Sequence, residues 1–162
     1  MAIQGKNKQP ETKPGNGQTM NHTKSAAAEK RSVDGKNGSS EVDIEACRLA
    51  AEQGDPVAQN KLGECYDYGK GVERDYEEAV RWYRRAAEQG NCDAQANLAS
   101  MYLDGHGVPE DYAEAFKWLS LAAAQGNPQG QVGVGYCYQL GFGVPVDYGE
   151  AVKFYRLAVE QG

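Results

Sequence analysis

A spacing of 36 residues between matching phrases constrains the fold of this chain more than any other feature. The phrases AAEQG, AAEQG, AAAQG and AVEQG end at Gly54, Gly90, Gly126 and Gly162. Aligning the chain on these glycines also superposes a leucine or valine, a tyrosine, a Gly-x-Gly-Val loop and an Asp-Tyr pair. Such a period is typical of repeat proteins, in which each copy stacks on the next. The sequence predicts a lone leading helix at 43–54 and three full repeats at 55–90, 91–126 and 127–162.

Each repeat has the pattern of two short helices. In the first copy, Ala58, Leu62 and Tyr66 recur at helical spacing and give the first helix an apolar face. The second helix begins after Asp75, an N-cap residue with Glu78 three positions later. Because helices this short are marginal alone in water, they are expected to gain stability by stacking. The predicted fold class is therefore all-α, an α-solenoid of stacked antiparallel helical hairpins with seven helices and no β-sheet.

Composition separates a tail from the repeats. Residues 1–42 are rich in Lys, Asn, Gln, Gly and Ser and are predicted to be a disordered polar tail. The net charge of the whole chain is −6, which argues against a nucleic acid or an anionic membrane as partner. No run approaches the roughly 18 apolar residues of a membrane span, and the N-terminus lacks a signal-type apolar run. We therefore expect a cytoplasmic protein with no membrane partner.

The residue types that catalysis or metal binding requires do not gather in this sequence. His22 lies in the tail, and His106 aligns with a lysine and a phenylalanine, as expected of a solvent-facing loop position. Carboxylate pairs such as Asp75 and Glu78 recur in every repeat at cap positions, which favours capping over acid–base catalysis. The cysteines show no CxxC or zinc-type spacing. We expect no enzymatic activity, no cofactor and no bound metal.

The four cysteines fall at different kinds of position. Cys65 and Cys137 share one repeat position with Met101, which indicates a small core slot. Cys47 aligns with apolar residues of the later copies. Cys92 lies at a helix start, where the helix dipole can lower a thiol pKa, so it is the cysteine with a case for reactivity.

On these residues, the chain resembles the Sel-1-like repeat family, whose α-helical hairpins are related to tetratricopeptide repeats. The resemblance is carried by 58–90 and 94–126, and the Gly-x-Gly-Val loop distinguishes both from tetratricopeptide repeats. It implies a right-handed superhelix and a non-catalytic scaffold or adaptor that binds a protein or peptide partner. Two alternatives stay open. One is β-lactamase-like or penicillin-binding activity, as in a cysteine-rich branch whose regular cysteine pairs this chain lacks. The other is that the chain is a fragment of a larger repeat-containing regulator.

The tetratricopeptide-type stack implies a concave groove lined by the first helix of each hairpin. The positions expected to face a partner there are Asn60, Lys61, Glu64, Asn97, Ser100, Val132, Tyr136 and Leu140. The last three are spaced by four residues and share one helical face, with a tyrosine that suits an aromatic anchor. The alternative is that this apolar patch packs against a fourth repeat or against a homodimer partner.

The last helix carries a second apolar face. Val152, Tyr155 and Val159 are not followed by a covering hairpin in this sequence, whereas solenoids need polar end caps for solubility. We expect either self-association through this uncapped C-terminal repeat or a natural protein that continues beyond it.

Overall fold

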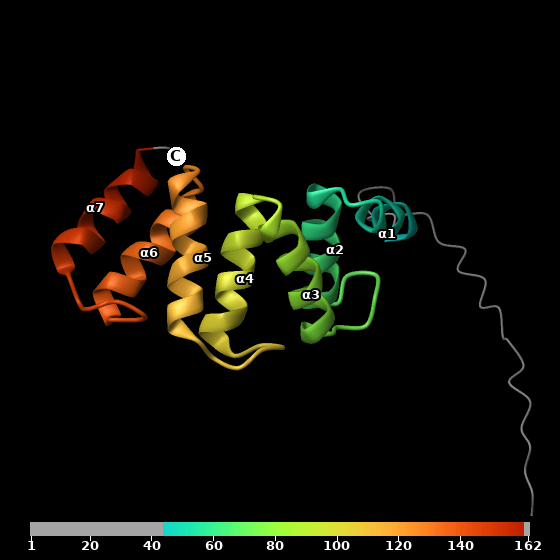
Figure 1. Cartoon of the computed structure of the whole chain (residues 1–162), viewed down its shortest axis with the longest axis horizontal. Coiled ribbons are helices and arrows are strands. Elements are labelled where there is room, and N and C mark those ends of the chain that lie inside the picture. The colour runs from blue at the N-terminus through green and yellow to red at the C-terminus, as the bar shows by residue number, and fades with distance from the viewer. Residues whose placement is uncertain (1–43, 161–162) are drawn as a thin grey trace, which may run out of the picture. The chain divides into compact units, whose positions relative to one another are not determined.

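The computed structural model describes residues 44–160, which form seven α-helices with no strand among them. The helices are α1 (Ile44–Glu52), α2 (Pro56–Tyr68), α3 (Tyr76–Glu88), α4 (Cys92–Asp104), α5 (Tyr112–Ala124), α6 (Pro128–Leu140) and α7 (Tyr148–Val159). They follow one another in chain order as a row of hairpins, from α1 in cyan to α7 in red (Figure 1). The predicted all-α stack of hairpins is confirmed, and the predicted polar tail, 1–42, lies outside the described residues.

The helices begin at the predicted N-caps. The Oδ1 atom of Asp75 accepts a hydrogen bond from the backbone N–H of Glu78 at 3.0 Å, and Asp111 and Asp147 cap α5 and α7 in the same way. The Glu78 side chain does not complete a capping box, because it pairs with Arg81 one turn later. Each first helix ends at a left-handed glycine, such as Gly69 with φ +67°.

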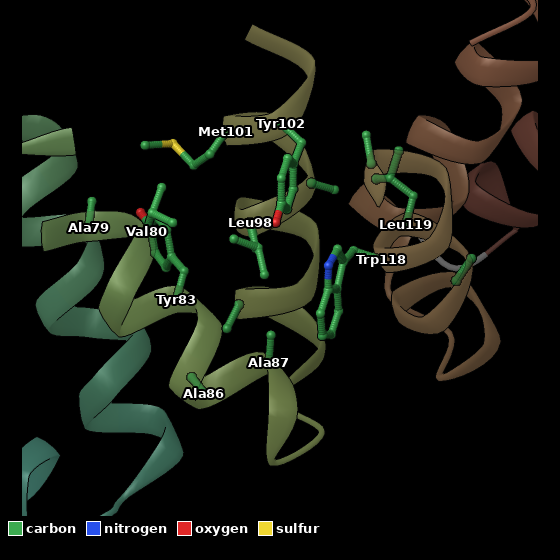
Figure 2. Close-up of a cluster of buried hydrophobic side chains, with 14 of the residues drawn as sticks. Ala79, Val80, Tyr83, Ala86, Ala87, Leu98, Met101, Tyr102, Trp118 and Leu119 are labelled. Carbon is green, nitrogen blue, oxygen red and sulfur yellow. The ribbon is translucent and has the colours of Figure 1, made fainter. Parts of the chain in front are cut away.

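The core lies between successive helices along the row. The helices of each hairpin pack together, and α3 packs on α4 as α5 packs on α6. Leu98 of α4 is fully buried, with Val80 and Tyr83 of α3 on one side and Trp118 of α5 on the other (Figure 2). Its repeat counterparts Leu62 and Val134 are buried as well, as expected for the aligned apolar position. The core is therefore one layer repeated along the stack.

Small residues on the first helix make room for large residues on the second. A Cβ atom added to Gly63 would lie 2.6 Å from the Cδ1 atom of Tyr83, whose side chain is fully buried. The same arrangement recurs at Gly135, where a Cβ atom would lie 2.7 Å from Tyr155 Cε1. The small residues therefore let the two helices of a hairpin approach closely, as predicted, and leave space for the tyrosine rings between them.

The Gly-x-Gly loop of each repeat rests on the preceding repeat. The rings of Tyr76 and His106 stack with centroids 4.5 Å apart, and those of Tyr112 and Phe142 stack at 4.1 Å. A Cβ atom on Gly107 would lie 2.3 Å from the Tyr76 carbonyl oxygen, and this glycine has φ +69°. His106 is exposed, as expected of its loop position, yet the stack gives it a structural contact that the sequence did not suggest.

A buried glutamine in each first helix joins neighbouring repeats. The Nε2 atom of Gln95 donates to the Ala87 carbonyl at 3.1 Å, and Gln59 donates to the Ala51 carbonyl at 3.0 Å. Gln89 in turn donates to Gln59 Oε1 at 2.7 Å, so these side chains form a hydrogen-bond network within the apolar stack. The bonds satisfy polar groups that burial would otherwise leave without partners.

Candidate partner-binding surface

The first helices of the three hairpins form one continuous surface. Helices α4 and α6 pack directly against each other. Helices α2 and α4 are joined by a hydrogen bond from Asn97 Nδ2 to Asn60 Oδ1 of 3.0 Å. We call this the first-helix surface. All eight positions that the sequence assigned to partner binding lie on these three helices, although Asn60 is buried.

The polar end of the first-helix surface is organised by Asn60. This side chain donates to Glu64 Oε1 at 2.9 Å and accepts the bond from Asn97, and only 8% of the residue is exposed. Asn60 therefore acts below the surface by holding Glu64 and Asn97, which are both half-buried. Lys61 is exposed beside them, while the half-buried Ser100 donates its hydroxyl to the Ala96 carbonyl at 3.2 Å.

The apolar end is formed by three residues of α6, which we call the α6 stripe. Val132, Tyr136 and Leu140 are 48%, 45% and 43% exposed. The Tyr136 ring meets the ring of Phe142 edge to face with centroids 5.9 Å apart, and Phe142 stacks on Tyr112. The exposed tyrosine is thus supported by an aromatic pair, which limits the freedom it would lose on binding.

The described residues contain no group of three or more His, Cys, Asp or Glu side chains that could hold a metal ion. The four cysteines are free thiols. Burial raises the pKa of Cys137 to about 11 and also raises the pKa of Cys65, so both favour the neutral thiol at physiological pH. The half-buried Cys92 contacts the Asn127 amide through its sulfur at 3.7 Å.

A basic cluster on α3 is largely engaged within the protein. Arg81 pairs with Glu77 and Glu78, and Arg84 donates to the Tyr102 hydroxyl at 2.8 Å. The cluster lines a shallow hollow of about 370 Å³. Because Glu77 and Glu88 line the same hollow, its charge is mixed, and it is a weaker candidate for binding than the first-helix surface.

Another hollow, which is mostly apolar and has a volume of about 330 Å³, lies on α7. It is lined by Val152, Tyr155, Arg156, Val159 and Glu160, and we call it the end face.

Among the helices of the described residues, none is long and apolar enough to cross a lipid bilayer.

Solved structures with the same fold are similar to this chain. The protective antigen c5321 of uropathogenic Escherichia coli, which displays an SLR fold, matches with a TM-score of 0.71 and 45% identity over 75% of this chain. A Sel1 repeat protein from Oxalobacter formigenes matches with a TM-score of 0.70 and 34% identity over 74% of this chain. The chain covers only 26% and 47% of these two proteins.

Helicobacter pylori cysteine rich protein B has a TM-score of 0.57 and 21% identity, with 75% of this chain and 92% of that chain covered. At this identity the likeness concerns the fold alone. A search of curated proteins found no significant match. The family model for the Sel1 repeat matches residues 56–91, 92–127 and 128–162, in register with the hairpins described above. The chain therefore belongs to the Sel1 repeat family.

Proposed function

We propose that this protein is a non-catalytic scaffold that binds a peptide segment of a partner protein along the first-helix surface, with Tyr136 as the aromatic anchor. The Sel1 repeat fold commonly mediates protein–protein interactions, and its members are generally non-catalytic. The observation that carries the proposal is the exposed α6 stripe beside the hydrogen-bonded polar end of the same surface.

The fold itself does not require the α6 stripe to be apolar. The equivalent positions of the second repeat hold Ala96, Ser100 and Asp104, and those of the first hold Asn60, Glu64 and Tyr68. The first of these positions is buried in both earlier repeats, where Asn60 is 8% and Ala96 0% exposed, so the hairpin forms with a polar or small residue even where the next first helix covers it. An exposed valine, tyrosine and leucine at these positions favour contact with an apolar partner side chain.

The polar end complements the stripe by offering directional contacts. Glu64 and Asn97 are held in place by Asn60, so they lose little side-chain freedom when a partner binds. The exposed Lys61 adds a charge that salt screens. We infer that the partner segment places an apolar residue on α6 and polar groups over α2 and α4.

The test is replacement of the anchor in the whole chain. Proteins captured by the wild-type chain would be identified by mass spectrometry, and the affinity of the most abundant one measured for each variant. Tyr136→Ala should weaken binding by more than about 1 kcal/mol, roughly fivefold, because an aromatic anchor contributes most at its pocket. Lys61→Ala should have a small effect that disappears at high salt.

The matched control is Leu121→Ala, which removes an apolar residue of similar exposure, 44%, from the second helix α5. This variant should bind as the wild type does. If Tyr136→Ala unfolds the third hairpin, or leaves every captured partner bound as before, Tyr136 is a packing residue and the proposal is wrong.

A further inference from the structure

The end face on α7 repeats a face that is buried elsewhere in the stack. Val80 of α3 is 5% exposed and Ala87 is 2% exposed beneath α4, and their α7 counterparts, Val152 and Val159, are 47% and 77% exposed. Helix α7 thus presents an uncovered surface of the kind that α3 uses to bind the first helix of the next repeat.

Helix α1 covers α2 in the way that α3 covers α4. The Ala51 carbonyl accepts the hydrogen bond of Gln59, as the Ala87 carbonyl accepts that of Gln95. The segment 44–54, IEACRLAAEQG, aligns with 152–162, VKFYRLAVEQG. The shared residues include the arginine, leucine and alanine in the middle of each segment. The end of α7 therefore carries the residue pattern with which α1 binds α2.

The fit of α1 on α2 is less complete than that of α3 on α4. Helix α1 has 9 residues where α3 has 13. Arg84 donates to the Tyr102 hydroxyl, whereas the buried Nε atom of the equivalent Arg48 has no hydrogen-bond partner. Tyr102 is 9% exposed, and its counterpart Tyr66 is only half-buried. An unsatisfied buried donor and a partly covered tyrosine weaken the hold of α1.

Helix α7 has the parts that α1 lacks. Tyr148 occupies the position of Tyr76 and is 69% exposed, and the loop residue equivalent to His106 on the first repeat is Lys70. The Lys70 ammonium group lies 4.7 Å from the centroid of its own Tyr68 ring, and it would have to turn to the Tyr148 ring to replace the aromatic stack. Arg156 occupies the position of Arg84, and Tyr66 that of Tyr102. If α7 packed on α2 of a second copy as α3 packs on α4, Arg156 would lie beside the Tyr66 hydroxyl of that copy.

We propose that the end face of one chain binds α2 of a second copy and displaces that copy's α1, so that the chains assemble head to tail. The junction would reproduce the α3–α4 contact, with the Val159 carbonyl accepting the hydrogen bond of Gln59. Helix α1 then acts as a built-in competitor, because its attachment to α2 gives it a high effective concentration. A heterologous contact joins two unlike surfaces and leaves one of each free at the ends of an open assembly, so the assembly can extend with concentration. The inference does not rest on the proposed function, but the two compete. Continuing the stack would place α2 of the second copy beside α6, as α4 lies beside α2, and would cover Val132.

The experiment is sedimentation velocity of the full chain over a range of concentrations, with variants that act on each side of the junction. The wild type should grow past the mass of a dimer as concentration rises. Val159→Arg should remain a monomer, because it places a charge on the end face without touching a buried residue. Its control is Val146→Arg at a loop position that is 51% exposed, which should assemble as the wild type does.

The competitor is tested by loosening α1. Ala51→Arg replaces the buried residue of α1, which is 1% exposed, and should lower the concentration needed for assembly by roughly tenfold, as expected when a competing state is removed. Ile44→Asp, at a half-buried position, is the milder variant if Ala51→Arg loses helical circular dichroism. Combining Ala51→Arg with Val159→Arg should restore the monomer.

Three results would overturn the proposal. The wild type could remain a monomer throughout, or its mass could level off at a dimer, as a symmetric contact between two end faces requires. The third is assembly of the α1 variants no more readily than the wild type, which would show that α2 is not the acceptor.

Discussion

At the scale of single residues, each hairpin divides one core volume between a small and a large side chain. Gly63 faces Tyr83 and Gly135 faces Tyr155, and the second repeat has Ala99 and Leu119 at the equivalent positions. The identity of a third residue depends on whether the large side chain is tyrosine or leucine, because a tyrosine hydroxyl needs a hydrogen-bond partner and a leucine does not. Tyr83 donates to Asp67 at 3.2 Å and Tyr155 donates to Gln139 at 2.7 Å, while the second repeat has Leu103 at that position.

This pairing predicts the outcome of a double-mutant cycle. Gly63→Ala should lower the free energy of unfolding by about 1–3 kcal/mol, because the new methyl group meets a buried ring that cannot move. That cost exceeds the roughly 1 kcal/mol that alanine gains over glycine in a helix. Combined with Tyr83→Leu, the same change should cost clearly less. Urea unfolding of the four proteins measures the coupling, and strictly additive costs would contradict the size matching.

At the scale of helices, the sequence predicts the elements well because each boundary has a local cause. Asp75 and its counterparts cap the second helices, and glycines such as Gly69 end the first ones. The contacts between elements were harder to foresee. Nothing in the spacing of Tyr76 and His106 indicates that a loop stacks on the preceding repeat, since this depends on how two hairpins pack.

At the candidate site, too, features within one helix were predictable from the sequence and contacts between helices were not. Helical spacing put Val132, Tyr136 and Leu140 on one face of α6, and all three residues are exposed, while their role in binding stays a prediction. It also assigned Asn60 to the surface, but α4 approaches from the side and Asn97 covers this residue. A single helix pattern cannot register burial by a neighbouring repeat, and for the same reason the inter-repeat bonds of Gln59 and Gln95 were missed.

The caps give a prediction at the same scale. Asp111→Ala should lower the free energy of unfolding by about 1 kcal/mol, because the N–H groups of Ala113 and Glu114 lose their acceptor. Asp111→Asn keeps a side-chain oxygen and should cost much less. Chemical denaturation of both variants makes the comparison, and equal costs would indicate that the charge matters rather than the cap.

At the scale of the whole stack, burial is concentrated in the middle. Helices α3 and α5 each bury five residues, whereas α1 buries only Ala51 and α7 only Ala151. Stability in such stacks is approximately a sum of contacts between neighbours, so an end helix with one neighbour is held less firmly. The central hairpin is thus the most stable part of the described chain.

Hydrogen exchange should reveal this gradient. In dilute solution, the amides of α1 and α7 should exchange faster than those of α4 and α5, because local opening at the ends breaks fewer contacts. Mass spectrometry of peptic fragments would resolve the helices. Protection that is uniform along the stack would contradict the gradient. Protection of α7 that rises with protein concentration would be a separate sign of the head-to-tail contact.

The seating of each Gly-x-Gly loop on the preceding repeat determines how such a protein can change its length. Removing 76–111 would place Tyr112 directly after Asp75, and Phe142 would keep its aromatic neighbour while Gly143 kept the carbonyl against which it lies. A deletion one residue longer or shorter would shift the chain out of register at the join. The number of residues in the stack can therefore increase or decrease only by whole repeats of 36 residues.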